Sequence, residues 1–504
     1  MKFIKNIFAA SAVILAGTAF TACDDFLDIE PENTVPEEKV DFTNISNMYQ
    51  PVSGAYATLR TNHMHWAIGM EFVIRDDDVW NGNDDGGDFY NMSEHYIYNA
   101  GNWALDEIWK QFYGMVKTCN SALISLDEYA KNITSEADMK TYRSYCGEVR
   151  ILRALAYYRL TQFFGDCTLY HTNTMGNLRR AKRDVIYEYM LQDLQYAIDN
   201  CQRKRPNEMD HLGAFTAYTA EALAAKVYLN LGQYDKVETL TQDIINNGNF
   251  ELYSDYYQMW KIPGRLCNES LMECQCTDFG EGNGDYIGID QYFNCMMPSM
   301  KNDNTVLKTY GGWKNIGFYD EFVQWAKDRG EKIRFTTTFL QGGTTTPSGD
   351  YIEHNTNLAN TDCWNGKWYV PLEQITEGRT GFYNRNNVRV IRYAEVLLMN
   401  AEAKVRQGKN GDAPFNEIRR RAEMPELTNV TVDQILDERR MELACEWGER
   451  YNDLIRCGLA EKLIGPKGWT PAKTYLPVPS AQIDVSRELK EEPFATLQEA
   501  LDNE

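Results

Sequence analysis

The sequence has few positive charges for its size. Its 504 residues include 51 lysines and arginines against 73 aspartates and glutamates, which gives a formal net charge of −22 at pH 7. A uniformly acidic chain repels the phosphate backbone of nucleic acids, whose binding depends on contacts from lysine and arginine. We therefore expect no nucleic-acid partner.

The sequence also lacks a long apolar run after its first 22 residues. No later stretch reaches the roughly 18 apolar residues that a membrane-spanning helix needs. Residues 1–22 differ, because Lys2 and Lys5 precede an apolar run from Ile7 to Phe20, as in a secretory signal peptide. Nothing after this leader is predicted to span a bilayer.

Motifs of common catalytic chemistry are missing. The chain has no H-E-x-x-H, no G-x-S-x-G and no P-loop, and the glycines between Gly280 and Gly288 lack dinucleotide-binding spacing. The 12 cysteines contain no zinc-type C-x₂-C pair. We expect neither an enzyme nor a resident cofactor. A glycosidase needs only two carboxylates, so a surface glycosidase remains an alternative.

A cysteine stands where the leader ends. Small residues precede Cys23 in the run GTAFTAC, which resembles a bacterial lipoprotein box, in which the cysteine is diacylated and becomes the N-terminus. We expect lipidation at Cys23, and several acyl chains make such an anchor stable. Residues 23–40 are acidic and contain proline, which predicts an extended tether and resembles the export signal of Bacteroidetes surface lipoproteins.

Paired amphipathic helices dominate the rest of the chain. In residues 211–248, apolar side chains recur at three- and four-residue steps on both sides of Gly232, which predicts two antiparallel helices like a tetratricopeptide hairpin. Residues 393–422 repeat the pattern, with Asp412 as the predicted cap of the second helix, and residues 148–165 form a looser copy. The predicted fold class is mostly α, a tetratricopeptide-like scaffold of stacked helices.

Two long segments interrupt these helices. Residues 68–103 are rich in Asp, Asn, Gly and aromatic residues, and lie between predicted helices at 42–65 and 103–130. Residues 255–381 combine glycine and threonine runs with tryptophans. We predict long loops and short strands in both segments, and long loops inside compact domains are usually functional.

Short motifs along the chain resemble the SusD/RagB family of surface lipoproteins. The likeness, with the lipoprotein box, covers essentially the whole chain after the leader and implies one SusD-like domain at residues 41–504. Its helical part, about 41–254, and its C-terminal part, about 255–504, are expected to be intertwined. The motifs are Trp109-x₃-Tyr113-x₆-Asn120, Glu148-x₃-Leu152-Arg153-Ala154, Phe164-Gly165-Asp166, the charged run from Leu436 to Arg456, and Tyr475-Leu476-Pro477-Val478-Pro479.

The charged run has a structural interpretation. Arg450 and Arg456 lie three residues on either side of Asp453, so on a helix both can pair with its carboxylate. Alternating charges along a helix are usually a packed or solvated face. We therefore predict that this cluster stabilises the fold and is not catalytic.

The resemblance implies binding without catalysis. Members of this family resemble lids that catch nutrients, usually oligosaccharides, at the outer membrane and pass them to a TonB-dependent transporter of the SusC type. A lipid-anchored position on the cell surface follows from the same likeness. A tetratricopeptide scaffold that binds only proteins and a peptide-binding RagB-like protein remain alternatives.

The two interrupting segments offer the chemistry that a sugar site needs. Sugar rings present apolar C–H faces edged by hydroxyls, so a capture site needs flat aromatic rings and polar side chains. Further candidates for such rings are Trp66, Trp325, Trp364 and Trp368. The predicted ligand-binding residues are Asp77, Trp80, Tyr96, Tyr98 and Trp103 in the first segment, with Tyr292 and Trp313 in the second.

A calcium site is a weaker hypothesis for the first segment. The run from Asn81 to Gly86 imitates the start of an EF-hand loop, but its first position is not aspartate and its twelfth is Met92 instead of glutamate. Two interpretations of this run are left: an irregular calcium site, or an acidic loop exposed to solvent. The candidate calcium ligands are Asp76, Asp77, Asp78, Asn81, Asn83 and Asp85.

Overall fold

The computed structural model divides into two compact units, residues 1–47 and 48–504. In the first unit the described part is residues 40–47, which contain a 3₁₀ turn at Ile45–Asn47. The rest of the description concerns the second unit. The structure describes residues 40–82, 89–174, 176–277, 296–355, 358, 360, 362–375 and 385–503.

The predicted hairpin at residues 211–248 is confirmed. Helix α8 (Ala217–Asn230) follows Thr216, whose side chain accepts a hydrogen bond from the backbone N–H of Thr219, and helix α9 (Tyr234–Asn247) follows the turn at Gly232. Gly232 has a φ of 67°, which glycine adopts without strain. The two helices pack against each other, so the apolar periodicity predicted this element correctly.

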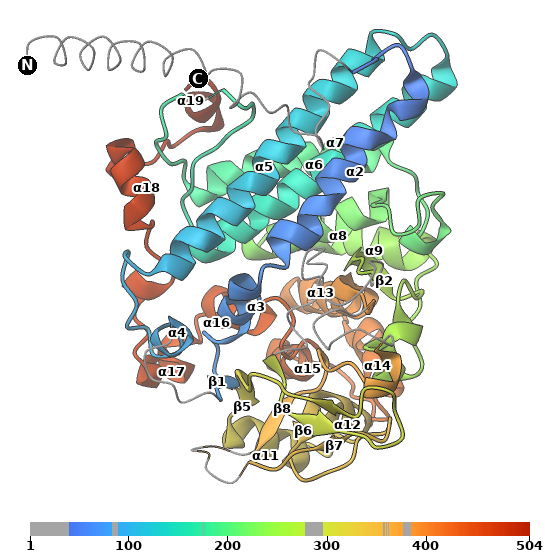
Figure 1. Ribbon diagram of the computed structural model, residues 1–504, viewed down its shortest axis with the longest axis vertical. Helices are drawn as coiled ribbons and strands as arrows, with labels where there is room; N and C mark the ends of the chain where they lie inside the picture. The colour runs from blue at the N-terminus through green and yellow to red at the C-terminus, as the bar shows by residue number, and fades with distance from the viewer. Residues whose placement is uncertain are drawn as a thin grey trace, which may run out of the picture. The chain divides into compact units, whose positions relative to one another are not determined.

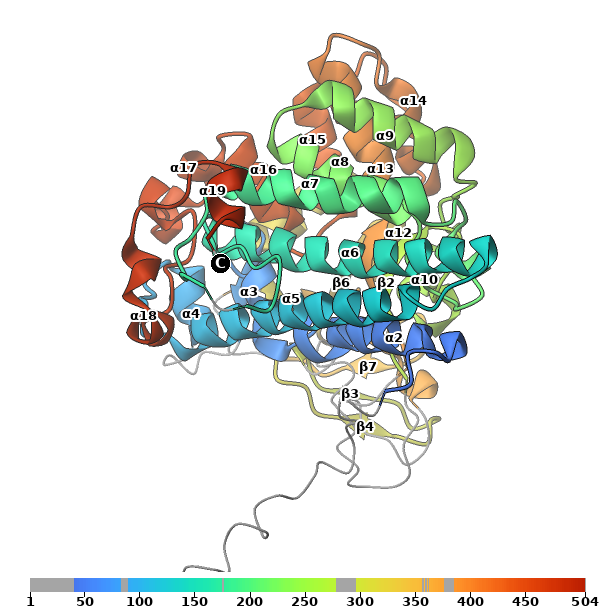
Figure 2. The same cartoon turned by 90° about the horizontal axis from the view of Figure 1, so that it is seen from above.

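Further helices extend the hairpin into one continuous stack (Figures 1 and 2). From α5 to α9 each helix packs against the next one in the sequence, and α9 then packs directly against α13. The second predicted hairpin, α13 and α14, thus joins the first although residues 248–392 separate them in the chain. The remaining bounds are α2 (Tyr49–Thr58), α5 (Trp103–Ala130), α6 (Glu136–Phe164), α7 (Arg183–Asn200), α13 (Tyr393–Arg406) and α14 (Asp412–Arg421).

Asp412 does not cap α14 as predicted. Gly411 occupies the cap position, and the Asp412 carboxylate accepts hydrogen bonds from the backbone N–H groups of Asn429 and Val430, both at 2.9 Å. The Asp412 carboxylate is therefore bound by two backbone N–H groups that follow α14 in the sequence. Asp412 holds the loop after α14 against the start of that helix.

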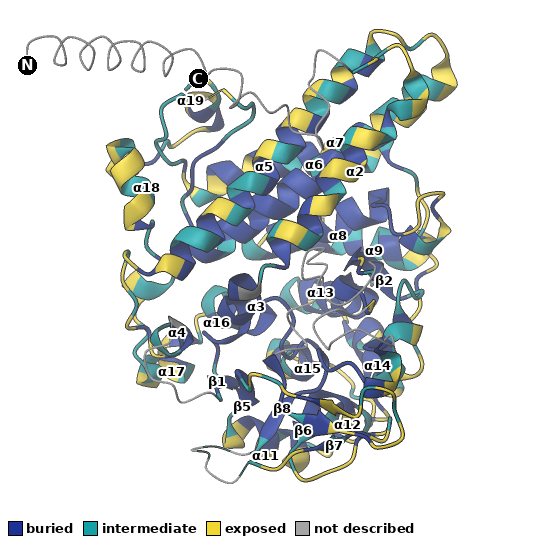
Figure 3. Ribbon diagram, viewed as in Figure 1, coloured by how far each residue is buried: buried dark blue, intermediate teal, exposed yellow. Residues whose placement is uncertain are grey.

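Residues 68–103 contain more regular structure than predicted. The segment includes most of helix α3 (Trp66–Val73), strand β1 (Val79–Asn81) and helix α4 (Phe89–Glu94). Residues 67–73 are all buried (Figure 3). A helix buried on all sides has no polar face, so its sequence shows no amphipathic period. With only eight residues as well, α3 gave no periodic signal in the sequence.

The second segment consists mainly of loops and short strands, as predicted, with small helices between them. Among the described residues, its strands form three antiparallel sheets together with β1 of the first segment and β9, which follows the second. The largest sheet has the order β1-β5-β8-β6, and the others are β4-β3-β7 and β2-β9. The bounds are β2 (Ser270–Cys274), β3 (Met300–Lys301), β4 (Thr309–Tyr310), β5 (Ile316–Phe318), β6 (Phe339–Gln341), β7 (Tyr351–Ile352), β8 (Cys363–Asn365), β9 (Val388–Arg392), α10 (Tyr256–Met259), α11 (Asp320–Asp328) and α12 (Ile333–Thr338).

Buried ion pairs join the C-terminal helices to the rest of the unit. Arg456 pairs with Asp453 as predicted, at 2.7 Å, but the second carboxylate oxygen of Asp453 accepts from Arg439 and not from Arg450. Burial alone would raise the pKa of Asp453, but the two arginines outweigh it and lower the pKa to about 2. The helices are α15 (Val432–Glu442), α16 (Glu449–Arg456), α17 (Ala460–Leu463), α18 (Ser480–Val485) and α19 (Leu497–Leu501).

Candidate functional site

The two predicted segments meet at Asn315. Its backbone carbonyl accepts a hydrogen bond from Gly82 N–H at 3.3 Å, and its backbone N–H donates to the carbonyl of Met296 at 3.0 Å. Its side-chain amide lies 3.4 Å from the amide oxygen of Asn81. We call Asn81, Gly82, Trp313, Lys314 and Asn315 the sheet-end surface, because they flank the paired ends of β1 and β5.

Trp313 is the predicted ligand residue that this surface exposes. Its side chain is 39% exposed, and it follows two glycines. A side chain at Gly312 would collide with the carbonyl of Met297, so the backbone runs close to that residue just before Trp313. Lys314 follows with a φ of 60°, a left-handed conformation that is uncommon outside glycine. The tight backbone on both sides fixes the position of Trp313.

Trp80 lies beneath this surface and not on it. The side chain is only 5% exposed, and its Nε1–H donates to the carbonyl of Phe318 at 3.1 Å. Strand register places Trp80 and Trp364 on either side of Gly317, with ring centroids 6.3 Å apart. A Cβ at Gly317 would lie 2.5 Å from Trp80, so glycine leaves the room that this ring occupies. The expectation that Trp80 offers an exposed ring is corrected.

The tyrosines of the first segment belong to a hydrophobic core. Tyr96 is fully buried in a cluster with Tyr451 and Leu454, and its hydroxyl donates to the backbone carbonyl of Arg75. Tyr98 packs against the same cluster, and its hydroxyl donates to the carbonyl of Lys473 at 3.1 Å. Burial raises the pKa of Tyr98 to about 12. The expectation of exposed rings is therefore wrong for Tyr96, and Tyr98 is mostly covered.

Asp77 is held by an arginine from the other end of the chain. The two carboxylate oxygens accept from Arg450 Nε and Nη2, at 2.8 and 2.7 Å. Burial alone would raise the pKa of Asp77, but Arg450 and then Arg440 outweigh it and lower that pKa. The carboxylate is thus already paired, which explains why Arg450 does not pair with Asp453. Its assignment as a sugar-binding group stays a prediction.

The calcium hypothesis falls partly outside the described residues, because Asn83 and Asp85 lie there. Asp76 Oδ1 accepts the backbone N–H groups of Asp78 and Val79, at 2.8 and 3.0 Å, and Asp78 pairs with Arg440. Burial, with Asp78 close by, raises the pKa of Asp76 to about 8. Within the described residues, no group of three or more His, Cys, Asp or Glu side chains is arranged to hold a metal ion.

The other predicted residues lie apart from the sheet-end surface or outside the described ranges. Trp103 is 52% exposed, but it is the first residue of α5, next to the point where Ser480 N–H donates to the carbonyl of Ala100. Tyr292 and Cys23 belong to segments that the structure does not describe. No helix among the described residues is long and apolar enough to cross a membrane.

A polar cluster beside Trp364 was not predicted from the sequence. Asp362 accepts hydrogen bonds from Trp364 Nε1 at 2.7 Å and from the backbone N–H of Asn355 at 2.8 Å, and it contacts His354 Nδ1 at 2.8 Å. The His354 side chain is 55% exposed. The local signal was the Asp-x-Trp spacing, which lets the carboxylate reach the indole N–H. This cluster places an exposed polar ring next to the buried tryptophan pair.

Comparisons with known proteins agree on one family. A family model described as the SusD family matches residues 300–473, and a second, described as "Starch-binding associating with outer membrane", matches residues 25–229. A SusD-like protein of Bacteroides ovatus is 24% identical over 69% of this chain and 66% of that protein. SusD-like protein P2 of Formosa agariphila is 24% identical over 96% of this chain and 97% of that protein.

Solved structures show the same fold. Surface glycan-binding protein A from Bacteroides thetaiotaomicron, in complex with laminarihexaose, superposes with a TM-score of 0.75 at 22% identity over 88% of this chain and 98% of that one. A crystal structure with a xylogluco-oligosaccharide superposes with a TM-score of 0.74 at 18% identity over 89% of this chain and 99% of that one. At such low identity the likeness establishes the arrangement of helices and strands, and it leaves the ligand open.

Proposed function

This chain belongs to the SusD-like family, and from that premise we propose that it captures an oligosaccharide at the cell surface without cleaving it. The observation that carries the proposal is the exposed ring of Trp313 where the two segments meet at Asn315. A sugar ring can stack its apolar face on such an indole, and a capture site also needs polar groups for the hydroxyls, a role that the exposed ring of His354 could fill. The relatives whose structures contain bound oligosaccharides support the same assignment.

We propose that delivery follows capture. A transporter of the SusC type, TonB-dependent and in the outer membrane, is the expected partner, and a lipid on Cys23 would hold the protein beside it. The support is the lipoprotein box at the end of the leader and a family model whose description names association with the outer membrane. Several acyl chains would make the attachment stable.

The contacts of the acidic residues favour binding over hydrolysis. Asp77 and Asp78 pair with Arg450 and Arg440, and Asp76 accepts two backbone N–H groups. A glycosidase needs one carboxyl group free to protonate the leaving oxygen and a second one to act as base or nucleophile. The acidic run that precedes β1 within the described residues is thus engaged in the fold. The glycosidase alternative now requires other carboxylates.

A single experiment separates the three functions that the sequence left open. Protein lacking residues 1–23 is screened against a panel of neutral and acidic oligosaccharides, with binding measured by calorimetry and products by chromatography. Binding without new products supports the capture protein, and product formation would establish a glycosidase. Absence of both, with binding to peptides or proteins, would favour the scaffold or the peptide-binding alternative.

A further inference from the structure

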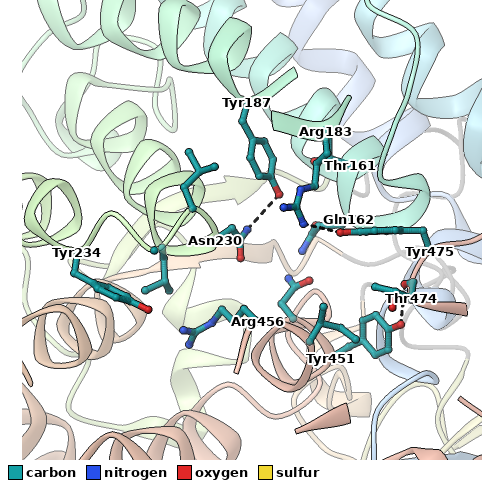
Figure 4. Close-up of a pocket in the computed structure, with 15 residues that line it drawn as sticks. Thr161, Gln162, Arg183, Tyr187, Asn230, Tyr234, Tyr451, Arg456, Thr474 and Tyr475 are labelled. Carbon is teal, nitrogen blue, oxygen red and sulfur yellow. Dashed lines mark hydrogen bonds between the residues drawn. The ribbon is translucent and has the colours of Figure 1, made fainter. Parts of the chain in front are cut away.

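A polar cavity of about 360 Å³ lies where the helical stack meets α16 (Figure 4). Its walls come from the ends of α6 and α8, the starts of α7 and α9, α16, and the segment at Thr474 and Tyr475. None of these residues belongs to the sheet-end surface. The cavity volume lies within the roughly 300–1,000 Å³ typical of small-molecule sites.

The walls contain no acidic side chain. The chain has 73 aspartates and glutamates, yet the residues around this cavity include two arginines, Arg183 and Arg456, and no carboxylate. A groove on the outer face of α9 differs sharply, because Glu221, Asp235 and Glu238 are among its lining residues. The protein has a net charge of −22, but this cavity is lined by cationic and neutral groups. Its lining therefore favours an anionic ligand.

The two arginines contribute differently. Arg456 is fully engaged, because Glu402 accepts from Nη1 and Nη2 at 2.5 and 2.7 Å and Asp453 accepts from Nη2 at 2.7 Å. Arg183 donates from Nη1 to the hydroxyl of Tyr475 at 2.6 Å. Its carboxylate contact is Asp184 at 3.2 Å, whose side chain is 69% exposed. An exposed ion pair of this kind is weak, so Asp184 compensates the charge of Arg183 only slightly. The guanidinium can therefore bind an anionic ligand.

One hydrogen-bond donor of the cavity wall has no partner among the described residues. The amide nitrogen of Asn452 is buried and has no hydrogen-bond partner among the described residues. The hydroxyl of Tyr475 accepts from Arg183, so its own proton remains available. Figure 4 shows Tyr187, Arg183, Tyr234 and Arg456 arranged around the same space. A buried donor without a partner costs free energy, and a ligand oxygen would remove that cost.

We propose that this cavity binds a small organic carboxylate, of the size and polarity of a uronic acid. Arg183 and Asn452 would hold the carboxylate oxygens, and the tyrosine hydroxyls would meet the remaining polar groups of the ligand. The site is separate from the sheet-end surface and does not depend on the proposed capture of oligosaccharides.

The test compares glucuronate with glucose, which has the same ring without the charge. Binding to the full chain in mild detergent is measured by saturation-transfer NMR and calorimetry. We expect glucuronate to bind at least tenfold more tightly than glucose, and to bind equally well to Trp313→Ala. Arg183→Gln should weaken it at least tenfold, because charge-assisted hydrogen bonds are the strong ones. The matched control is Arg143→Gln, which changes an exposed arginine of α6 that does not line the cavity and should bind as the original chain does.

Asn452→Ala provides an independent variant. The amide nitrogen of Asn452 has no partner to lose, so this variant should fold normally and bind glucuronate severalfold more weakly. Equal binding of glucose and glucuronate, no binding of glucuronate, or full binding by either Arg183→Gln or Asn452→Ala would overturn the proposal. Loss of glucuronate binding in Trp313→Ala would also overturn it, because it would place that ligand at the sheet-end surface.

Discussion

The indole rings of Trp80 and Trp364 lie over Gly317, with centroids 6.3 Å apart, on the two strands that flank β5 in the four-stranded sheet. Both rings are buried, and a Cβ on Gly82 would lie 2.3 Å from the Trp364 ring. The Trp364 ring therefore packs directly beneath the backbone at Gly82, which also lies close to the carbonyl of Lys314, the residue after Trp313. Several consequences of this arrangement are measurable.

The exposed and the buried tryptophan should respond differently to truncation. Trp313→Ala should lower oligosaccharide affinity at least tenfold with little change in melting temperature, because a half-exposed ring contributes little to the core. Trp103→Ala removes another exposed ring, at the start of α5, and should leave affinity unchanged. Calorimetric titrations of both variants check this, and an equal loss in both would remove Trp313 from the site.

Trp80→Ala should destabilise the protein by about 3–5 kcal/mol, the usual cost of truncating a buried aromatic ring. Any loss of sugar binding in Trp80→Ala would follow from the lost packing beneath the sheet-end surface. Thermal and urea unfolding measure the effect. A variant as stable as the original chain would contradict the burial of the ring.

Gly317 should not tolerate a side chain. Gly317→Ala places a methyl group 2.5 Å from Trp80 Nε1, and overpacking of this kind costs about 1–3 kcal/mol. Gly311→Ala is the matched control, because a Cβ there would have no heavy atom within 4 Å. Urea unfolding of the two variants should separate them clearly. Equal stability would show that Trp80 moves aside at no cost.

Asp77 should matter for stability. Asp77→Asn removes the charge that Arg450 binds with two hydrogen bonds and leaves a mostly buried guanidinium poorly paired. We expect a loss of about 2–3 kcal/mol in the free energy of unfolding, as for hydrogen bonds to charged groups. Glu426→Gln, in an exposed pair with Arg420, should change stability by less than about 1 kcal/mol. The opposite ranking in chemical unfolding would refute the assignment.

Glu148 should make stability depend on pH. Burial raises its pKa from 4.5 to about 8, and a hydrogen bond from Tyr56 only partly offsets this. The folded state therefore holds a proton that the unfolded state releases, and the contribution of Glu148 to stability falls as pH rises from about 4.5 to about 8. Glu148→Gln should stabilise the protein at pH 9 on the order of 2–4 kcal/mol more than at pH 4. Glu136→Gln, exposed at the start of the same helix, should show no such pH effect in thermal unfolding.

The sequence predicted α5 and α9 from their amphipathic pattern, because each of these helices presents one side to water. Helix α8 is buried from Ala217 to Val227, and its longer apolar repeat, which stops at Gly232, still identified it. Helix α3 escaped detection because it has only eight residues and those from Ala67 to Val73 are all buried.

The sequence was less informative about which aromatic rings face water. Trp80 and Trp313 occur in equally polar segments, yet one is 5% and the other 39% exposed. The difference comes from strand pairing with Gly317, more than 230 residues along the chain from Trp80. Likewise Arg450 pairs with Asp77 and not with nearby Asp453, because the tertiary fold brings a distant carboxylate closer. Such choices depend on contacts that no local pattern contains.

The packing of α9 against α13 has a consequence for synthesis. Val237 and Ile244 of α9 are buried, and Thr241 accepts a hydrogen bond from Asn400 in α13. A nascent chain that has just released α9 from the ribosome must still elongate through residues 248–392 before this partner emerges. During that interval the apolar face of α9 is uncovered, so the growing chain exposes an incomplete edge of the helical stack until translation supplies α13.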